Sequence, residues 1–191
     1  MAKKVFFSFH YQDVIDFRAN VVRNHGSFKL SKDDAGFYDS SMWEKAKKES
    51  DLALKRLINS GLKNTSNTCI LVGTETFNRR WVDYEIFKSV EKGNHIFAVH
   101  INNIKGKDQK TKNLGNNPLD YLGYATDSTG KILSLYYLIN GKWESYPDLD
   151  GWTVKEFSKN DREKIIRLSS IYPIYDWVKN DGYNNFKTWV K

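Results

Sequence analysis

The sequence has little cysteine or proline and no long hydrophobic run. The single cysteine, Cys69, cannot form an internal disulfide, which agrees with a reducing compartment. With three prolines in 191 residues, we find no linker that would separate two domains. No apolar run approaches the roughly 18–20 residues that cross a bilayer, and His10 interrupts the N-terminal apolar stretch before a signal-peptide core forms. We therefore expect one cytoplasmic domain, 1–191, with no membrane contact.

Arginine is also scarce, although the chain carries a net charge of +7. Lysine, the residue type of solvated surfaces, supplies most of the excess, and few arginines are available to read base edges. The local lysine cluster at 105–112 lies among glycine and asparagine and is typical of a solvated loop. The charge balance thus disfavours nucleic acid as a partner, and it equally fits a site that attracts a phosphate-bearing small molecule.

What is present is a globular pattern. Hydrophobic residues make up 40% of the chain and aromatic residues 15%, which excludes a disordered segment. Three short apolar runs, at 5–9, 68–73 and 95–101, show little alternation, as in strands of a parallel sheet that is covered on both faces. A further strand is expected near 35–39.

Helical patterns separate these runs. Asp13 is placed to cap a helix whose apolar positions continue to residue 22. A second helix begins at a Ser41-x-x-Glu44 capping box, and Gly61 is placed to end it. A third covers 78–91. Alternating strands and helices over residues 1–102 predict an α/β domain with a central, mainly parallel sheet.

Beyond residue 102 the pattern changes, and 103–191 is predicted to add a hairpin and helices to the core. Residues 103–117 are expected to form a long polar loop. The apolar segments 132–139 and 142–146 flank Asn140-Gly141, the dipeptide that favours a type I′ hairpin turn. A helix is expected at 161–169, and the aromatic side chains of 172–190 are spaced as if they dock on the core.

The candidate catalytic segment opens the third helix. Trp81 and Glu85 are four residues apart, so their side chains point the same way. Both flank the apolar stripe of this helix, where a carboxylate can be partly desolvated beside an indole while a ligand still reaches it. An ordinary surface glutamate beside a half-buried tryptophan explains the same spacing.

The motifs resemble those of a known family. The Phe-Phe-Ser-Phe segment at 6–9 resembles the first strand of TIR domains, and Trp81-x-x-x-Glu85 resembles the segment that carries the catalytic glutamate of NAD-cleaving TIR enzymes. An ordered set of motifs over the whole chain is similar to TIR proteins of Thoeris antiphage systems; it comprises 3–13, 39–44, 76–81 and 181–184. The sequence departs from many TIR domains in two ways, with Val82 where they have cysteine and no Pro-Gly loop in 29–42.

The resemblance implies a flavodoxin-like TIR fold and NAD+ as substrate rather than as a cofactor. Nicotinamide is already a cationic leaving group, so one carboxylate, Glu85, suffices to stabilise an oxocarbenium-like ribose and to hold its hydroxyls. Attack by water gives ADP-ribose, whereas attack by a hydroxyl of the same molecule gives a cyclic ADP-ribose isomer. In Thoeris relatives such a product is a second messenger that activates an NAD-depleting effector after phage infection. Self-association on activation is a further expectation.

Trp81 is also a candidate for substrate binding, as are residues of the first strand and of the segments that precede the helices. Phe6 or Phe9 is placed to wall the nicotinamide, and Ser8 and His10 lie at the end of the first strand, where they can meet ribose or phosphate. Asp39 precedes the capping box and is placed to face the same cleft, and Asn78 is placed to cap the Glu85 helix. Each has a structural alternative, namely core packing, a surface histidine, or turn and cap roles.

Other chemistry is disfavoured. The histidines share no ligand spacing with cysteines or carboxylates, so no metal site is predicted. The chain has neither Gly-x-Gly-x-x-Gly nor a Walker-type Gly-Lys-Ser/Thr, which argues against a redox use of NAD and against an NTPase. The main alternative to the enzyme is a TIR-like interaction module without catalysis.

Overall fold

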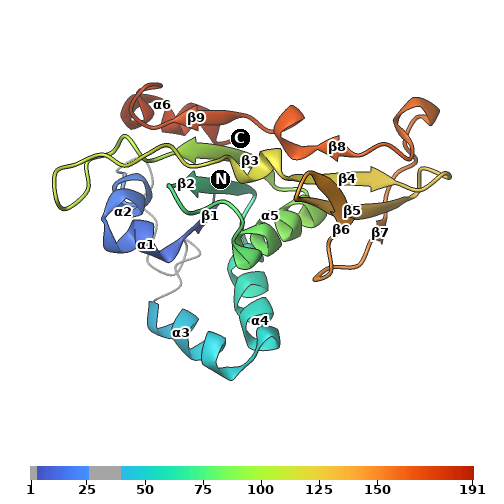
Figure 1. Cartoon of the computed structure of the whole chain (residues 1–191), viewed down its shortest axis with the longest axis horizontal. Helices are drawn as coiled ribbons and strands as arrows, with labels where there is room; N and C mark the ends of the chain where they lie inside the picture. The colour runs from blue at the N-terminus through green and yellow to red at the C-terminus, as the bar shows by residue number, and fades with distance from the viewer. Residues whose placement is uncertain (1–3, 26–39) are drawn as a thin grey trace.

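The computed structural model describes residues 4–25 and 40–191. In chain order its helices and strands are β1 Val5–Phe9, α1 Tyr11–Ile15, α2 Arg18–Arg23, α3 Ser40–Glu49, α4 Asp51–Leu62, β2 Asn67–Val72, α5 Arg80–Lys92, β3 His95–His100, β4 Leu122–Thr126, β5 Ile132–Ile139, β6 Lys142–Ser145, β7 Trp152–Thr153, β8 Ile166–Arg167, β9 Ile174–Asp176 and α6 Gly182–Trp189 (Figure 1). Three short 3₁₀ turns are η1 Pro118–Asp120, η2 Lys159–Asp161 and η3 Leu168–Ser170.

The first sheet has the order β1-β2-β3-β9, and all of its pairings are parallel. Successive side chains of β2 enter different cores, because a strand alternates its faces: Cys69 and Leu71 pack with α2 and α6, whereas Ile70 and Val72 pack with α5. The sheet is therefore covered on both faces, as the unalternating apolar runs predicted. This arrangement confirms the α/β prediction.

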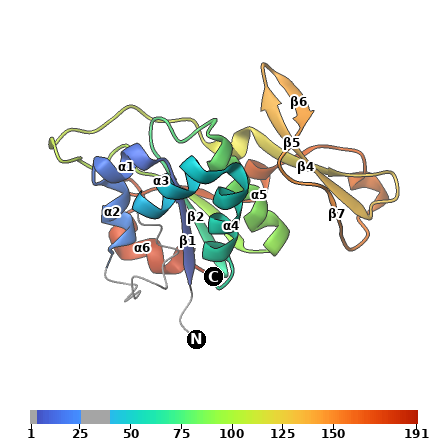
Figure 2. The ribbon, with the colours of Figure 1, turned by 90° about the horizontal axis from the view of Figure 1, so that it is seen from below.

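The second sheet is antiparallel, with the order β6-β5-β4-β8 and β7 paired to β5. The predicted hairpin joins β5 to β6, and both turn residues, Asn140 and Gly141, have positive φ (49° and 78°), as a type I′ turn requires. Figure 2 shows this hairpin extending away from the parallel sheet. Leu133 and Leu135 of β5 share a core with Ile86 of α5, so the second sheet supports the helix that carries Glu85.

Three helix predictions need correction. Asp13 does not cap a helix; His10 is the N-cap of α1, and Phe17, in the left-handed conformation (φ 67°), separates α1 from α2. The second predicted helix is two helices, because Ser50 ends α3 and caps α4 through Ala53 N–H (3.1 Å). Gly61 lies inside α4 and does not end it.

The third correction concerns 161–169, which contains β8 and parts of η2 and η3 instead of a helix. Ile166 pairs with Tyr124 of β4, so a tertiary pairing overrides the helical pattern. The strand expected near 35–39 lies outside the described residues, as do the side chains of the Ser41–Glu44 capping box.

The C-terminal aromatic residues dock on the first sheet, as predicted. Phe186 is fully buried and stacks on Phe7 of β1, with ring centroids 6.2 Å apart. Trp177 and Trp189 are also buried in this core, whereas Tyr183 is exposed. Figure 1 shows β9 and α6 beside the first sheet, so the chain beyond residue 102 returns to the core that residues 1–102 begin.

We expect Phe186→Ala to lower the free energy of unfolding by about 3–5 kcal/mol, because it opens a cavity in the core under α6. Val178→Ala is the matched control, since Val178 is 54% exposed and its change should cost well under about 1 kcal/mol. Urea denaturation of both variants measures the difference. Equal losses for the two would contradict the docking of α6.

Candidate functional site

Glu85 is held in place by the helix that carries it. Helix α5 begins after its N-cap Arg79 and ends at Gly93, whose positive φ of 75° is the usual left-handed helix end. Val82 and Ile86 anchor α5 against the first sheet. Glu85, on the same helix, is 6% exposed, so its carboxyl group is withdrawn from solvent.

Strand β1 supplies the partner of this carboxyl group. Ser8 is fully buried near the carboxyl end of β1, and its hydroxyl donates a hydrogen bond of 2.5 Å to Glu85 Oε2. Because Phe6 and Ser8 alternate with Phe7 on the strand, both point to the α5 side of the sheet. The contact joins residues that are 77 positions apart in the sequence.

Burial is the main influence on the Glu85 carboxyl. It raises the pKa of Glu85 from 4.5 to about 8, because the charged form loses its hydration, and the hydrogen bond from Ser8 lowers the pKa by a smaller amount. At neutral pH the ligand-free protein therefore holds Glu85 mainly as the neutral acid. A cation bound beside it would favour the carboxylate.

A cavity of about 460 Å³ opens onto Glu85. Its lining combines aromatic rings with cationic side chains and comprises Phe7, Phe9, His10, Tyr11, Trp43, Lys47, Asn78, Arg79, Arg80, Trp81, Val82 and Glu85. Flat rings suit a heteroaromatic base, and cations suit phosphate groups. The size lies within the range of small-molecule sites.

The cationic residues at the mouth of α5 are partly neutralised. Arg80 donates two hydrogen bonds of 2.8 Å to Asp148 and also forms an ion pair with Asp51 (2.7 Å). Arg79 forms an ion pair with Glu75, four residues earlier in the loop before α5 (2.8 Å). These pairs fix the arginines at the start of α5 and reduce the net positive charge that they present to a ligand.

Four predicted residues, Glu85, His10, Asn78 and Trp81, line this cavity, and Ser8 contacts Glu85. Burial, followed by the nearby Arg79 charge, lowers the pKa of His10, so the imidazole is neutral at pH 7. Asn78 does not cap α5; it adopts φ 60° just before the true N-cap, a left-handed conformation that asparagine tolerates. The structure thus gathers most of the predicted set at one edge of the sheet.

Phe6, a predicted residue in the described part of the chain, does not line the cavity. Phe6 is fully buried and packs with Ile58, Leu62 and Tyr84, between α4 and α5, because its position on β1 points it into this core. Phe9, the alternative for this role, lines the cavity, and so does Phe7. Asp39 lies outside the described residues.

Sequence reasoning missed several lining residues, among them Tyr11, Trp43 and Lys47. Trp43 and Lys47 are four residues apart on α3, the same spacing that singled out Trp81 and Glu85, and Tyr11 opens α1 two residues after the end of β1. These spacings were a usable signal, but choosing among many such pairs requires knowing that α3 faces the end of β1.

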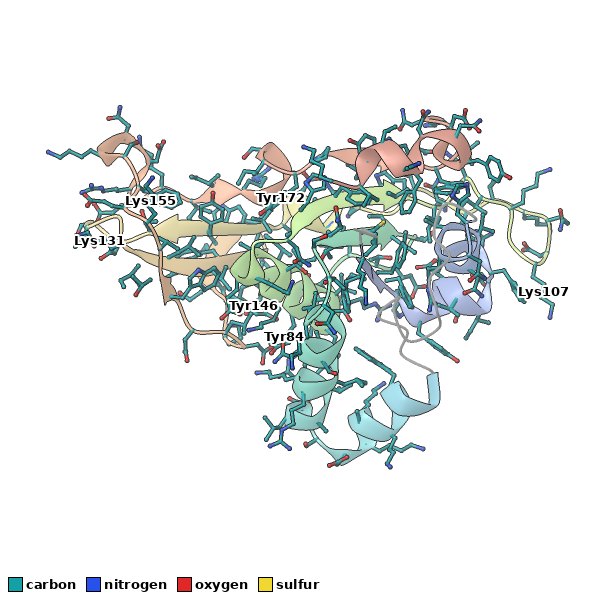
Figure 3. The ribbon with its side chains drawn as sticks, turned by 180° about the vertical axis from the view of Figure 1, so that it is seen from behind. Tyr84, Lys107, Lys131, Tyr146, Lys155 and Tyr172 are labelled. Carbon is teal, nitrogen blue, oxygen red and sulfur yellow. The ribbon has the colours of Figure 1, made fainter. Side chains whose placement is uncertain are left out.

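Lysine side chains are present at both ends of the molecule (Figure 3). Lys107 and Lys131 lie at opposite ends of the molecule in Figure 3.

Within residues 4–25 and 40–191, no three histidine, cysteine, aspartate or glutamate side chains are placed to hold a metal ion. No helix in the described part of the chain is long and apolar enough to span a bilayer.

Burial of Glu85 predicts a dependence of stability on pH. The pKa of Glu85 in the folded protein lies above its value in the unfolded chain. The contribution of Glu85 to the free energy of unfolding is therefore fully present below about pH 4.5 and is lost as the pH rises through about 8. Relative to Glu85→Gln, which cannot titrate, the wild type should lose on the order of a few kcal/mol of unfolding free energy between about pH 5 and about pH 9. Urea denaturation across this range measures the difference, and parallel curves would contradict the burial of an ionisable Glu85.

Comparison with known proteins agrees with this geometry. The model of a family described as "Thoeris protein ThsB, TIR-like domain" matches residues 6–106, the stretch that contains Ser8, the cavity and Glu85. A relative from Bacillus cereus (strain MSX-D12), named "Putative cyclic ADP-D-ribose synthase ThsB1", is 60% identical over 191 residues and covers 100% of both chains. The chain therefore belongs to the Thoeris ThsB family, whose members carry this TIR-like domain.

Proposed function

We propose that this protein cleaves the N-glycosidic bond of NAD+ and closes the product into a cyclic ADP-ribose isomer that signals in Thoeris antiphage defence. The observation that carries the proposal is the buried Glu85 carboxyl, hydrogen-bonded by Ser8 and open to a cavity of about 460 Å³. The printed name of the ThsB1 relative, a cyclic ADP-D-ribose synthase, supports the same product class.

The reaction needs few groups from the protein. The bond between ribose C1 and the pyridine nitrogen breaks, and its electron pair leaves with nicotinamide, which becomes neutral without receiving a proton. An ionised Glu85 offsets the positive charge that develops on the ribose and accepts hydrogen bonds from its hydroxyls. A hydroxyl oxygen of the adenosine half then bonds to C1, and its proton passes to solvent.

Because the pKa of Glu85 is raised in the free protein, substrate binding itself helps to convert Glu85 to the reactive carboxylate. The cationic nicotinamide ring of NAD+ stabilises the carboxylate and so lowers the pKa of Glu85 in the complex. The aromatic lining, with Trp43 and Trp81, excludes water from the ribosyl cation and so favours ring closure over hydrolysis. Water access at this point therefore sets the proportion of linear product.

The wider signalling role follows from the product. A small nucleotide diffuses from its source, so we propose that it activates a separate NAD-depleting effector and that a phage-derived signal, together with self-association, triggers synthesis. The single buried thiol, Cys69, is compatible with a cytoplasmic location, where disulfides are rare.

Glu85→Gln should abolish both nicotinamide release and the cyclic product, because the amide cannot offset the charge on the ribose. Purified protein is incubated with NAD+, alone and with extract of infected cells, and products are followed by chromatography and mass spectrometry, in which the cyclic isomer is lighter than ADP-ribose by one water. Glu91→Gln, an exposed glutamate on the same helix, is the matched control and should retain activity. Turnover or phage protection that survives Glu85→Gln would favour the interaction module instead.

The pH dependence of the reaction tests the partner of Glu85. We expect kcat/KM to rise with pH up to about 8, where free Glu85 ionises. Ser8→Ala removes the hydrogen bond that stabilises the carboxylate, so the rising limb should move to higher pH and kcat should fall roughly tenfold at neutral pH. An unshifted profile in Ser8→Ala would show that Ser8 does not set the charge state of Glu85.

A further inference from the structure

A second cavity, of about 350 Å³, lies beside the first at the carboxyl ends of β1 and β2. We call it the Asp13 cavity; it is lined by His10, Gln12, Asp13, Thr74, Glu75, Thr111, Lys112 and Asn113. His10 also lines the Glu85 cavity, so the two spaces share one side chain. The reaction as derived above uses none of the other seven residues.

Asp13 is the buried acid of this cavity. The residue is 4% exposed. The Thr76 hydroxyl lies 3.3 Å from Asp13 Oδ2, to which it can donate one hydrogen bond. Among the described residues, no hydrogen bond engages Asp13 Oδ1. Burial raises the pKa of Asp13 to about 6, so the group is still mainly a carboxylate at neutral pH and can accept hydrogen bonds from a ligand.

The backbone around Asp13 is built to admit this carboxylate. A Cβ atom at Gly73 would lie 2.1 Å from Asp13 Oδ1, so only glycine leaves room for it at the end of β2. The hydroxyl of Thr76 accepts a hydrogen bond from Gly73 N–H (2.9 Å), and its one proton lies within reach of both Leu71 O (3.2 Å) and Asp13 Oδ2 (3.3 Å). The position of the carboxylate therefore depends on several fixed groups at this sheet edge.

Charges of both signs meet at the boundary between the two cavities. Burial is the main cause that lowers the pKa of His10; the charges of Arg79, on the Glu85 side, and of Lys112, on the Asp13 side, lower it further, whereas Glu75 raises it. Arg79 is paired with Glu75, and Lys112 is paired with Asp16. His10 Nδ1 is buried and has no hydrogen-bond partner within the described part of the chain. A diphosphate placed at His10 would lie near both cations, each of which it would share with a carboxylate, and near this nitrogen.

We propose that the Asp13 cavity binds the adenosine ribose of a dinucleotide, with the Asp13 carboxylate accepting hydrogen bonds from the two ribose hydroxyls. The inference rests on the proposed function and names the second subsite of the same substrate. One half of the dinucleotide lies at Glu85, the diphosphate at His10, and the other ribose at Asp13. Carboxylates bind ribose diols in this way in other nucleotide sites.

This placement has a consequence for the product. The two riboses lie on opposite sides of the His10 side chain, which keeps the adenosine hydroxyls near the carbon that loses nicotinamide. If the adenosine half is not held at Asp13, water reacts with the ribosyl cation in place of an adenosine hydroxyl. Asp13 is thus a binding residue whose loss should raise the proportion of linear ADP-ribose.

The test is a binding measurement that needs no turnover. Isothermal titration of wild-type protein with AMP is compared with dideoxy-AMP, which lacks both ribose hydroxyls, and with Asp13→Asn. We expect either change to weaken binding by about tenfold or more, the factor that corresponds to one lost hydrogen bond to a charged group. Asp150→Asn, an exposed acid far along the chain, should bind AMP as the wild type does.

Nicotinamide mononucleotide, which lacks the adenosine half, separates the two cavities. Its affinity should depend on Asp13 much less than that of AMP. If Asp13→Asn fails to fold, the methyl signals of Thr74, Thr76 and Thr111 in the wild type decide by NMR: AMP should shift them and nicotinamide mononucleotide should not.

Equal affinity for AMP and dideoxy-AMP, or AMP that leaves these threonine signals unmoved, would overturn the proposal. AMP binding at Asp13 in a protein that never cleaves NAD+ would instead refute the proposed function while leaving the subsite in place. Conversely, NAD+ cleavage that is lost in Glu85→Gln, without AMP binding at Asp13, would refute this inference alone.

Discussion

The hydrogen bond between Ser8 and Glu85 joins two side chains that are almost completely withdrawn from bulk solvent. Its two ends come from β1 and α5, so the bond exists only when the helix is seated on the sheet in one position. The same burial that makes the carboxyl costly to ionise makes it effective once a cationic substrate arrives, because electrostatic interactions are stronger in a site that excludes water. Structure and proposed chemistry therefore depend on one desolvated group.

The rest of the molecule maintains the position of α5. Asp148, in the segment between β6 and β7, holds Arg80 at the start of the helix and also pairs with Lys55 of α4 (3.0 Å). These two cations lower the pKa of Asp148 to about 2, which shows how strongly the three charges are coupled. Tyr146 of the same segment packs on Phe87 of α5, with ring centroids 4.6 Å apart. The second sheet and the segment that follows β6 thus support α5.

The sequence predicted the parts of this fold that local pattern determines. The strands of the parallel sheet and the Asn140-Gly141 turn follow from apolar runs and from a turn that requires positive φ. The breaks at Phe17 and Ser50 did not follow, because a left-handed phenylalanine and a cap inside a long apolar stripe are chosen by tertiary packing. The 161–169 segment failed for the same reason, since its pairing with β4 is remote in sequence.

The candidate site could be predicted from the sequence only in part. Spacing alone put Trp81 and Glu85 on one helix face, and resemblance to TIR enzymes assigned the chemistry. Neither reveals that Ser8 donates to Glu85 or that Phe6 turns into the core, because strand register relative to α5 decides both. The burial of Asp13 was hidden as well, since a helix-capping aspartate and a buried aspartate look alike in sequence.

Direct titration of the Glu85 side-chain carbonyl by carbon-13 NMR, assigned with the Glu85→Gln spectrum, tests the central claim most closely. The account predicts a titration near pH 8 in the free protein, moving to lower pH when nicotinamide mononucleotide brings its cationic ring into the cavity. A carboxyl that titrates near its ordinary value of 4.5 and ignores the ligand would contradict it.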